Sequence, residues 1–179
     1  MTDATPTLPP TGRRETRGLD TALVFNRDFA ATPAEVWAAL TEPALLERWI
    51  GTLSGDPLAG TVVFRMTAEG EDVPEEPVTI TDCAPRERLA LQLGVGDGAA
   101  DPWRLEIDLA AHDAGTGPVG TTLTFAQLLT DPSGVGDIAP GWEYYLDRLA
   151  AVLRGADVEA VRFEHYHPGQ SEHYRAMFS

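Results

Sequence analysis

Cysteine is almost absent from this sequence. Cys83 is the one cysteine among 179 residues, so no disulfide can form within the chain, and nothing indicates an oxidising compartment. It ends the strand-like run Val78-Thr79-Ile80-Thr81-Asp82-Cys83. Such a run predicts a small buried hydrophobic residue at this position rather than a nucleophile.

Long apolar stretches are absent as well. The first twenty or so residues lack the apolar segment that a secretory signal carries. No window approaches the roughly eighteen consecutive apolar residues that a membrane-spanning helix requires. We therefore expect a cytoplasmic protein that does not enter a membrane.

Basic residues are scarce: 13 Lys and Arg stand against 28 Asp and Glu, for a formal charge of -15. A field of this sign repels phosphate backbones and anionic lipid surfaces, so nucleic acid and membranes are poor partners. The excess of acid favours solubility rather than marking a particular docking face.

Catalytic and cofactor motifs are missing too. The sequence has no Ser-His-Asp order, nucleophile elbow, P-loop or dinucleotide-binding fingerprint. The glycine-rich stretch Gly94 to Gly98 falls in a hairpin-like loop, where glycines serve the turn. We expect no cofactor.

What is present is the composition of one folded domain, with 43% hydrophobic and 23% charged residues. Residues 1–20 are rich in Pro, Gly and Arg, which predicts a flexible N-terminal tail. The domain is expected over residues 21–155. Residues 156–179 form an aromatic and His-containing tail that packs on the domain or on a partner subunit.

The local patterns predict an α+β fold. A first strand covers Ala22 to Phe29, and the capping box Thr32-Pro33-Ala34-Glu35 begins a short helix, followed by a second one at Pro43. An apolar stripe at helical spacing predicts a long helix from Gly141 to Gly155, with Pro140 at its start. Further strands are expected near Thr61–Ala68, Pro77–Cys83, Arg88–Gly94, Trp103–Ala110 and Thr121–Leu129. These elements predict a curved antiparallel sheet of about six strands wrapped around the long helix.

The run from Phe29 to Pro43 (FAATPAEVWAALTEP), followed by Leu46 and Trp49, is similar to a known family. With Gly141-Trp142 opening the last helix, the sequence resembles the START-like (SRPBCC, helix-grip) superfamily. More narrowly, it resembles the branch related to the C-terminal domain of the activator of the heat-shock-protein-90 ATPase. The likeness covers about Thr21 to Gly155. It implies a deep pocket between the concave sheet and the last helix, closed at one end by the two short helices.

Large side chains on these elements are candidates for the pocket lining. A straight helix diverges from a curved sheet, so side chains there can leave space for a ligand or can simply fill the core. The candidate ligand-binding residues are Trp49, Phe64, Met66, Trp103, Phe125, Gln127, Trp142 and Tyr145.

Three functions remain open at this point. The first is non-catalytic binding of a small hydrophobic or lipid-like ligand. The second is a co-chaperone-like interaction module with a chaperone partner, as the family name suggests. The third is an enzyme of the polyketide cyclase or dehydratase type, which requires Gln127, Tyr144, Tyr145 or Arg65 inside the pocket.

The C-terminal segment raises the question of metal. His165 and His167 alternate onto one side of an extended segment, and His173 could supply a third ligand. The spacing matches no standard zinc pattern, so we expect docking rather than metal binding. Exposed Trp side chains and this aromatic segment also make a homodimer an expectation.

Overall fold

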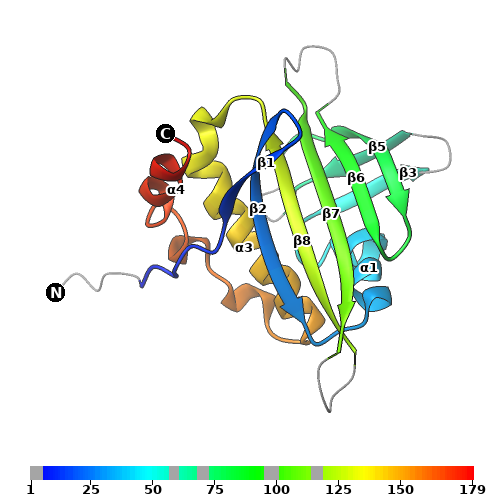
Figure 1. The fold of residues 1–179 in the computed structure, drawn as a ribbon. Coiled ribbons are helices and arrows are strands. Elements are labelled where there is room, and N and C mark those ends of the chain that lie inside the picture. Colours follow the sequence, from blue (N-terminus) through cyan, green and yellow to red (C-terminus); the bar gives the residue numbers. More distant parts are fainter. Residues whose placement is uncertain (1–5, 57–60, 68–72, 95–100, 114–118) are drawn as a thin grey trace.

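One antiparallel sheet of eight strands dominates the computed structural model of the protein (Figure 1). The structure describes residues 6–56, 61–67, 73–94, 101–113 and 119–179. Hydrogen-bonded neighbours follow the order β1-β2-β8-β7-β6-β5-β4-β3. The strands are β1 (Arg13–Arg17), β2 (Asp20–Phe29), β3 (Thr52–Asp56), β4 (Thr61–Arg65), β5 (Glu76–Ala84), β6 (Arg88–Leu93), β7 (Trp103–His112) and β8 (Gly120–Leu129).

The predicted α+β, helix-grip class is confirmed, but the sheet has two more strands than expected. One of them, β1, lies in the segment predicted to be a flexible tail, and that prediction is wrong for Arg13–Arg17. This strand pairs with β2 along its whole length, from Arg13 opposite Val24 to Arg17 opposite Asp20. Its side chains are polar and it lies at the sheet edge, so no apolar alternation marks it in the sequence.

The other unexpected strand, β3, forms the opposite edge of the sheet. Among the described residues it pairs with β4 alone, with Thr52 opposite Arg65. The sequence patterns predict no strand between the second short helix and Thr61. Backbone pairing with β4 supplies the order that the side-chain pattern does not indicate. Strand β4 itself ends at Arg65; Ala68, the predicted end, lies outside the described residues, as does Val95 to Gly98 of the glycine-rich stretch.

The two short helices form where the sequence predicted them. They are α1 (Pro33–Thr41) and α2 (Pro43–Leu46). The Thr32 side chain accepts a hydrogen bond from the Glu35 backbone N–H, and the Glu35 carboxylate accepts one from the Thr32 N–H at 2.7 Å. The bond from the Thr32 backbone, followed by a second one that the Thr32 hydroxyl donates to the carboxylate at 2.9 Å, lowers the pKa of Glu35. The capping box therefore fixes the point at which the chain leaves the sheet.

The long helix α3 (Val135–Leu153) begins earlier than predicted. The 3₁₀ turn η3 (Pro132–Gly134), capped by the Asp131 side chain, leads directly into it, so Pro140 lies inside the helix instead of at its start. At its other end Gly155 has a φ of 64°, and the Ala156 N–H donates to the Ala151 carbonyl at 2.8 Å. This glycine closes the helix as the sequence predicted.

The C-terminal segment packs on α3 of the same chain. It consists of η4 (Val158–Ala160), η5 (Phe163–His165) and α4 (Ser171–Met177). The Tyr166 hydroxyl donates to Asp147 at 2.7 Å, and the Tyr174 hydroxyl donates to Glu143. This segment was expected to pack on the domain or on a partner subunit, and in the structure it packs on the domain.

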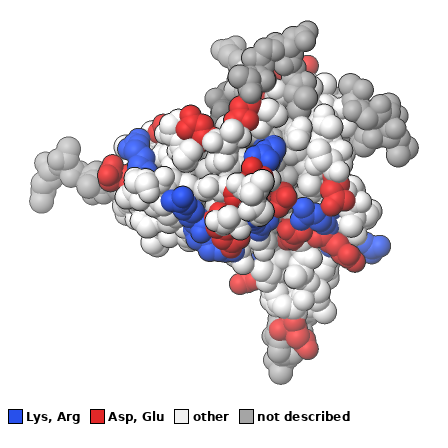
Figure 2. Space-filling model, turned by 45° about the horizontal axis from the view of Figure 1, so that its top comes forward, with Lys and Arg blue, Asp and Glu red and all other residues white. Residues whose placement is uncertain are grey.

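The sheet has an apolar inner face and a charged outer face. Helices α1 and α3 lie behind it in the view of Figure 1, and the core between them includes Leu23, Phe25, Leu123 and Phe125. Figure 2 shows Arg side chains next to Asp and Glu side chains across the middle of its view. Outer-face ion pairs at 2.7 Å join Arg17 to Glu106, Arg88 to Asp108 and Arg104 to Asp20. No helix among the described residues is long and apolar enough to span a membrane.

Candidate functional site

An apolar cavity of about 370 Å³ lies between the inner face of the sheet, α3 and the two short helices. A volume of this size falls in the range of small-molecule sites, roughly 300–1,000 Å³. Its lining is Trp37, Leu40, Thr41, Leu46, Trp49, Ile50, Leu53, Val62, Phe64, Val78, Ile80, Cys83, Pro85, Leu89, Leu91, Leu93, Leu105, Ile107, Leu123, Phe125, Trp142 and Leu146.

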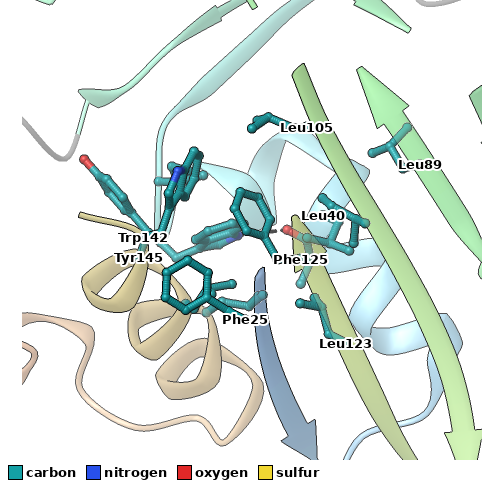
Figure 3. Packing of buried hydrophobic residues seen from close by; sticks show 14 of the residues in the cluster. Phe25, Leu40, Leu89, Leu105, Leu123, Phe125, Trp142 and Tyr145 are labelled. Atoms are coloured by element: carbon teal, nitrogen blue, oxygen red, sulfur yellow. Dashed lines mark hydrogen bonds between the residues drawn. The ribbon is translucent and has the colours of Figure 1, made fainter. Parts of the chain in front are cut away.

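Strict alternation in the central strands builds the sheet side of this cavity. Leu89, Leu91 and Leu93 of β6 line it, and the residues between them face the other side. The same period places Leu105 and Ile107 of β7 on the cavity. Figure 3 shows aromatic side chains of the core, with Leu89 and Leu105 reaching in from the strands opposite. A period of two therefore separates the apolar lining from the charged outer face.

A bulge in β5 decides which side chain reaches the cavity mouth. Ile80 pairs with Leu91, but Asp82 pairs with Ala90, so Thr81 is the extra residue. Thr81 and Asp82 therefore both lie away from the inner face, and Cys83 lines the cavity instead of Asp82. The prediction that Cys83 is buried is wrong, because it is exposed where the strand reaches the rim.

Trp142 and Leu146 line the cavity from α3, and residues of the sheet fix the position of Trp142. Its indole Nε1 donates to Gln127 Oε1 at 2.6 Å, and its ring lies 4.4 Å from that of Phe125 between centroids. Gln127 is 2% exposed and does not line the cavity. The structure therefore gives Gln127 the role of fixing the Trp142 ring.

Trp49 covers the end of the cavity that the short helices close. Its Nε1 donates to the Ala39 carbonyl at 2.9 Å, which ties the residue to α1. From α3, Arg148 Nε donates to the Trp49 carbonyl at 2.9 Å, and Arg148 also donates to the Tyr144 hydroxyl at 3.0 Å. Arg148 is largely buried, so it couples the closing segment to the long helix.

We expect Arg148→Met to loosen this closure. Methionine also has a long side chain and is also a good helix former. It has no hydrogen-bond donor for Trp49, so the buried Trp49 carbonyl is left unpaired. The free energy of unfolding should fall by about 1–3 kcal/mol, and affinity for a ligand of the cavity should fall with it. Urea denaturation measures the first effect. Arg154→Met, at the exposed end of the same helix, is the control and should change neither quantity.

A second cavity of about 230 Å³ adjoins the first. Phe64 and Leu93 line both. The rings of Trp103, in the second cavity, and Trp142, in the first, are 6.0 Å apart between centroids. The full lining of the second cavity is Phe64, Met66, Val73, Pro74, Glu76, Leu93, Gly94, Asp101 and Trp103.

The structure distributes the eight candidate ligand-binding residues over three environments. Trp49, Phe64, Phe125 and Trp142 line the main cavity. Met66 and Trp103 line the second cavity with Phe64. Gln127 and Tyr145 line neither; Tyr145 is 2% exposed and its ring contacts those of Trp142 and Tyr144. The aliphatic lining was not proposed from sequence, although the alternation in β6 and β7 indicates it.

The polar residues that an enzyme would need do not face the main cavity. None of Gln127, Tyr144, Tyr145 and Arg65 lies in its described lining. Arg65 pairs with Glu75 at 2.8 Å, and Tyr144 accepts from Arg148. Apart from indole N–H groups, the described part of the lining has only a hydroxyl and a thiol as polar side-chain groups, so these residues can enclose an apolar molecule but include no acid–base pair.

The three histidines considered as metal ligands have other neighbours. His167 Nε2 lies 2.9 Å from Asp137, and its ring stacks on Phe163. His173 contacts the Tyr174 ring edge-on, and the His165 carbonyl accepts from Leu8 at 2.8 Å. Within the described ranges no group of three or more His, Cys, Asp or Glu could hold a metal ion.

Comparison with solved structures finds the same fold in proteins of low sequence identity. CalU16 from Micromonospora echinospora is 24% identical with a TM-score of 0.66, covering 94% of this chain and 96% of its own. The protein encoded by gene BPP1335 from Bordetella parapertussis is 24% identical with a TM-score of 0.66, covering 98% and 94%. DynU16, from the dynemicin biosynthetic locus, is 23% identical with a TM-score of 0.58, covering 76% and 49%.

The search of curated proteins found no match. A family model does match, over residues 30–154, which takes in α1, α2, all strands from β3 to β8 and the whole of α3. The resemblance read from the sequence is thereby confirmed. The chain belongs to the family described as Activator of Hsp90 ATPase homolog 1-like protein.

Proposed function

We propose that the protein binds a small hydrophobic ligand in the main cavity without turning it over. The observation that carries this proposal is the composition of the lining, in which Thr41 and Cys83 are the only described residues that are neither aliphatic nor aromatic. The Thr41 hydroxyl donates to the Trp37 carbonyl at 2.7 Å, so it is already used within α1. An apolar molecule would enter such a space without leaving a polar group unpaired.

Affinity should then follow the apolar size of the ligand. Each methylene removed from water contributes about 0.8 kcal/mol, which corresponds to about a fourfold change in the dissociation constant. We expect affinity to rise at this rate along a series of linear alcohols and to stop rising once the cavity is filled.

The position of the one cysteine provides a direct measurement. Cys83 is exposed and also lines the cavity mouth, so a bound ligand should slow its reaction with a thiol reagent. We expect the reaction rate to fall as ligand is added and to level off at saturation. The ligand concentration that gives half of the full decrease should equal the dissociation constant found by thermal shift. Short alcohols of the same series are the control. Unchanged thiol reactivity together with no thermal shift across the series would contradict the proposal.

The likeness to DynU16 supports adding a second class of compound to the panel. That protein is described as belonging to a biosynthetic locus for dynemicin. Dynemicin is therefore worth testing beside the linear compounds, and aromatic compounds are worth testing because the aromatic side chains of the lining could stack on them. Native mass spectrometry of gently purified protein would show whether either class is retained.

A further inference from the structure

The second cavity differs from the main one in its charge. Glu76 and Asp101 both contribute to its wall, and none of its described lining residues is basic. One oxygen of Glu76 lies beside Gly94, 3.7 Å from the position that a Cβ on that glycine would occupy. The cavity therefore joins apolar walls to two carboxylates.

Glu76 is the carboxylate available to a ligand. Among the residues that the structure describes it has no hydrogen-bond or ion-pair partner, whereas Asp101 accepts a hydrogen bond from the Thr130 hydroxyl at 3.1 Å. The two arginines adjacent in sequence to lining residues are engaged in ion pairs, Arg65 with Glu75 and Arg104 with Asp20. Asp101 does raise the pKa of Arg104 as a secondary influence, after the hydrogen bond to Asp20.

Trp103 adds an aromatic surface to the same space. It is 36% exposed, whereas the next inward residues of β7, Leu105 and Ile107, are buried, so part of the Trp103 ring remains accessible. The face of an indole ring attracts cations. Glu76 and Trp103 thus make an environment that attracts a positive charge, and the two carboxylates repel a negative one.

We propose, resting on the function proposed above, that the natural ligand is an elongated amphiphile with a cationic end. Its apolar body occupies the main cavity, and its amine or ammonium group occupies the second cavity beside Trp103 and Glu76. Phe64 and Leu93 line both cavities, so the ligand would pass from one cavity to the other beside these two residues. Fatty acids, which place a carboxylate at this end, would bind less well.

The test compares three probes that share one chain: dodecylamine, dodecanol and dodecanoate, each below its micelle concentration at pH 7.5. Dissociation constants come from protection of the Cys83 thiol and from displacement of a fluorescent apolar dye. We expect the amine to bind most tightly and the carboxylate most weakly. If no probe binds, the proposed function itself fails; if the carboxylate binds as well as the amine, only the cationic end is overturned.

Variants separate local contact from overall charge. Glu76→Gln should weaken amine binding by about threefold to tenfold and leave dodecanol unchanged, because one charge-assisted contact is lost. Trp103→Leu should also weaken the amine more than the alcohol. Glu172→Gln, on α4, removes the same charge far along the chain and is the control. Equal loss of amine affinity in Glu76→Gln and Glu172→Gln would overturn the proposal.

Discussion

Replacing Glu143 with glutamine is expected to lower the free energy of unfolding by about 3–5 kcal/mol, the usual effect of removing one partner of a buried ion pair. Glu143 is 1% exposed, and its carboxylate accepts hydrogen bonds from four residues. Arg27 donates at 2.6 Å, the Thr11 hydroxyl at 2.8 Å and the Gly12 N–H at 3.2 Å, and the Tyr174 hydroxyl donates as well. An amide would direct its own N–H group at these donors and leave Arg27 without its closest counter-charge.

Urea denaturation of the two proteins measures this effect, with Glu164→Gln as the control. Glu164 pairs with Arg162, but both side chains are more than half exposed, so that variant should lose no more than about 1 kcal/mol. Equal stability of Glu143→Gln and wild type would show that the carboxylate is not needed to hold the two ends of the chain on α3.

The same carboxylate makes stability depend on pH. Burial alone would raise the pKa of Glu143, but the hydrogen bonds from Thr11, Tyr174 and Arg27 outweigh burial and lower it. A carboxyl group with a lowered pKa in the folded state stabilises the fold above its unfolded pKa of about 4.3, and that contribution is lost as the pH falls through the folded pKa. The Glu143→Gln variant should therefore lose less stability than wild type between pH 5 and the acid limit.

Filling the main cavity should remove ligand binding while keeping the fold. Leu91 of β6 is half-buried and lines the cavity. Leu91→Trp therefore places an indole ring in space that no side chain occupies. We expect the dissociation constant of an apolar ligand to rise by at least about tenfold, since more than 1.4 kcal/mol of apolar contact is lost. Calorimetric titration with a long alcohol measures this change.

The neighbouring residue provides the matched control. Gln92 alternates with Leu91 and faces the opposite side of the sheet, so Gln92→Trp adds the same ring to the same strand outside the cavity. Its ligand affinity should equal that of wild type. Comparable losses in both variants would mean that the effect comes from distortion of β6 and not from occupation of the cavity.

The fold was predictable wherever side-chain pattern and local chemistry agree. The Thr32 to Glu35 capping box fixed the start of α1, and the strand expected near Trp103–Ala110 is β7. Aromatic members of the lining, such as Trp142, followed from their place on an apolar helix stripe. In each case a few adjacent residues carry the signal.

Features that depend on distant partners escaped prediction. Strand β1 is polar and acquires order only by pairing with β2. The placement of Cys83 depends on one extra residue in β5, which becomes visible only in the register against β6. Gln127 was expected to face a ligand, but Trp142, fifteen residues away, takes its oxygen. Long-range register and pairing decide these positions, and local periodicity carries neither.

The order of the strands in the sheet also has a consequence for synthesis on the ribosome. Strand β2 is made early, but its neighbour β8 comes from residues near position 125, long after it. Until then Leu23 and Phe25, both 0% exposed in the finished protein, have neither β8 nor α3 to cover them. Apolar surface exposed for that long favours aggregation. The segment around Phe25 is therefore where a general chaperone should hold the nascent chain during translation.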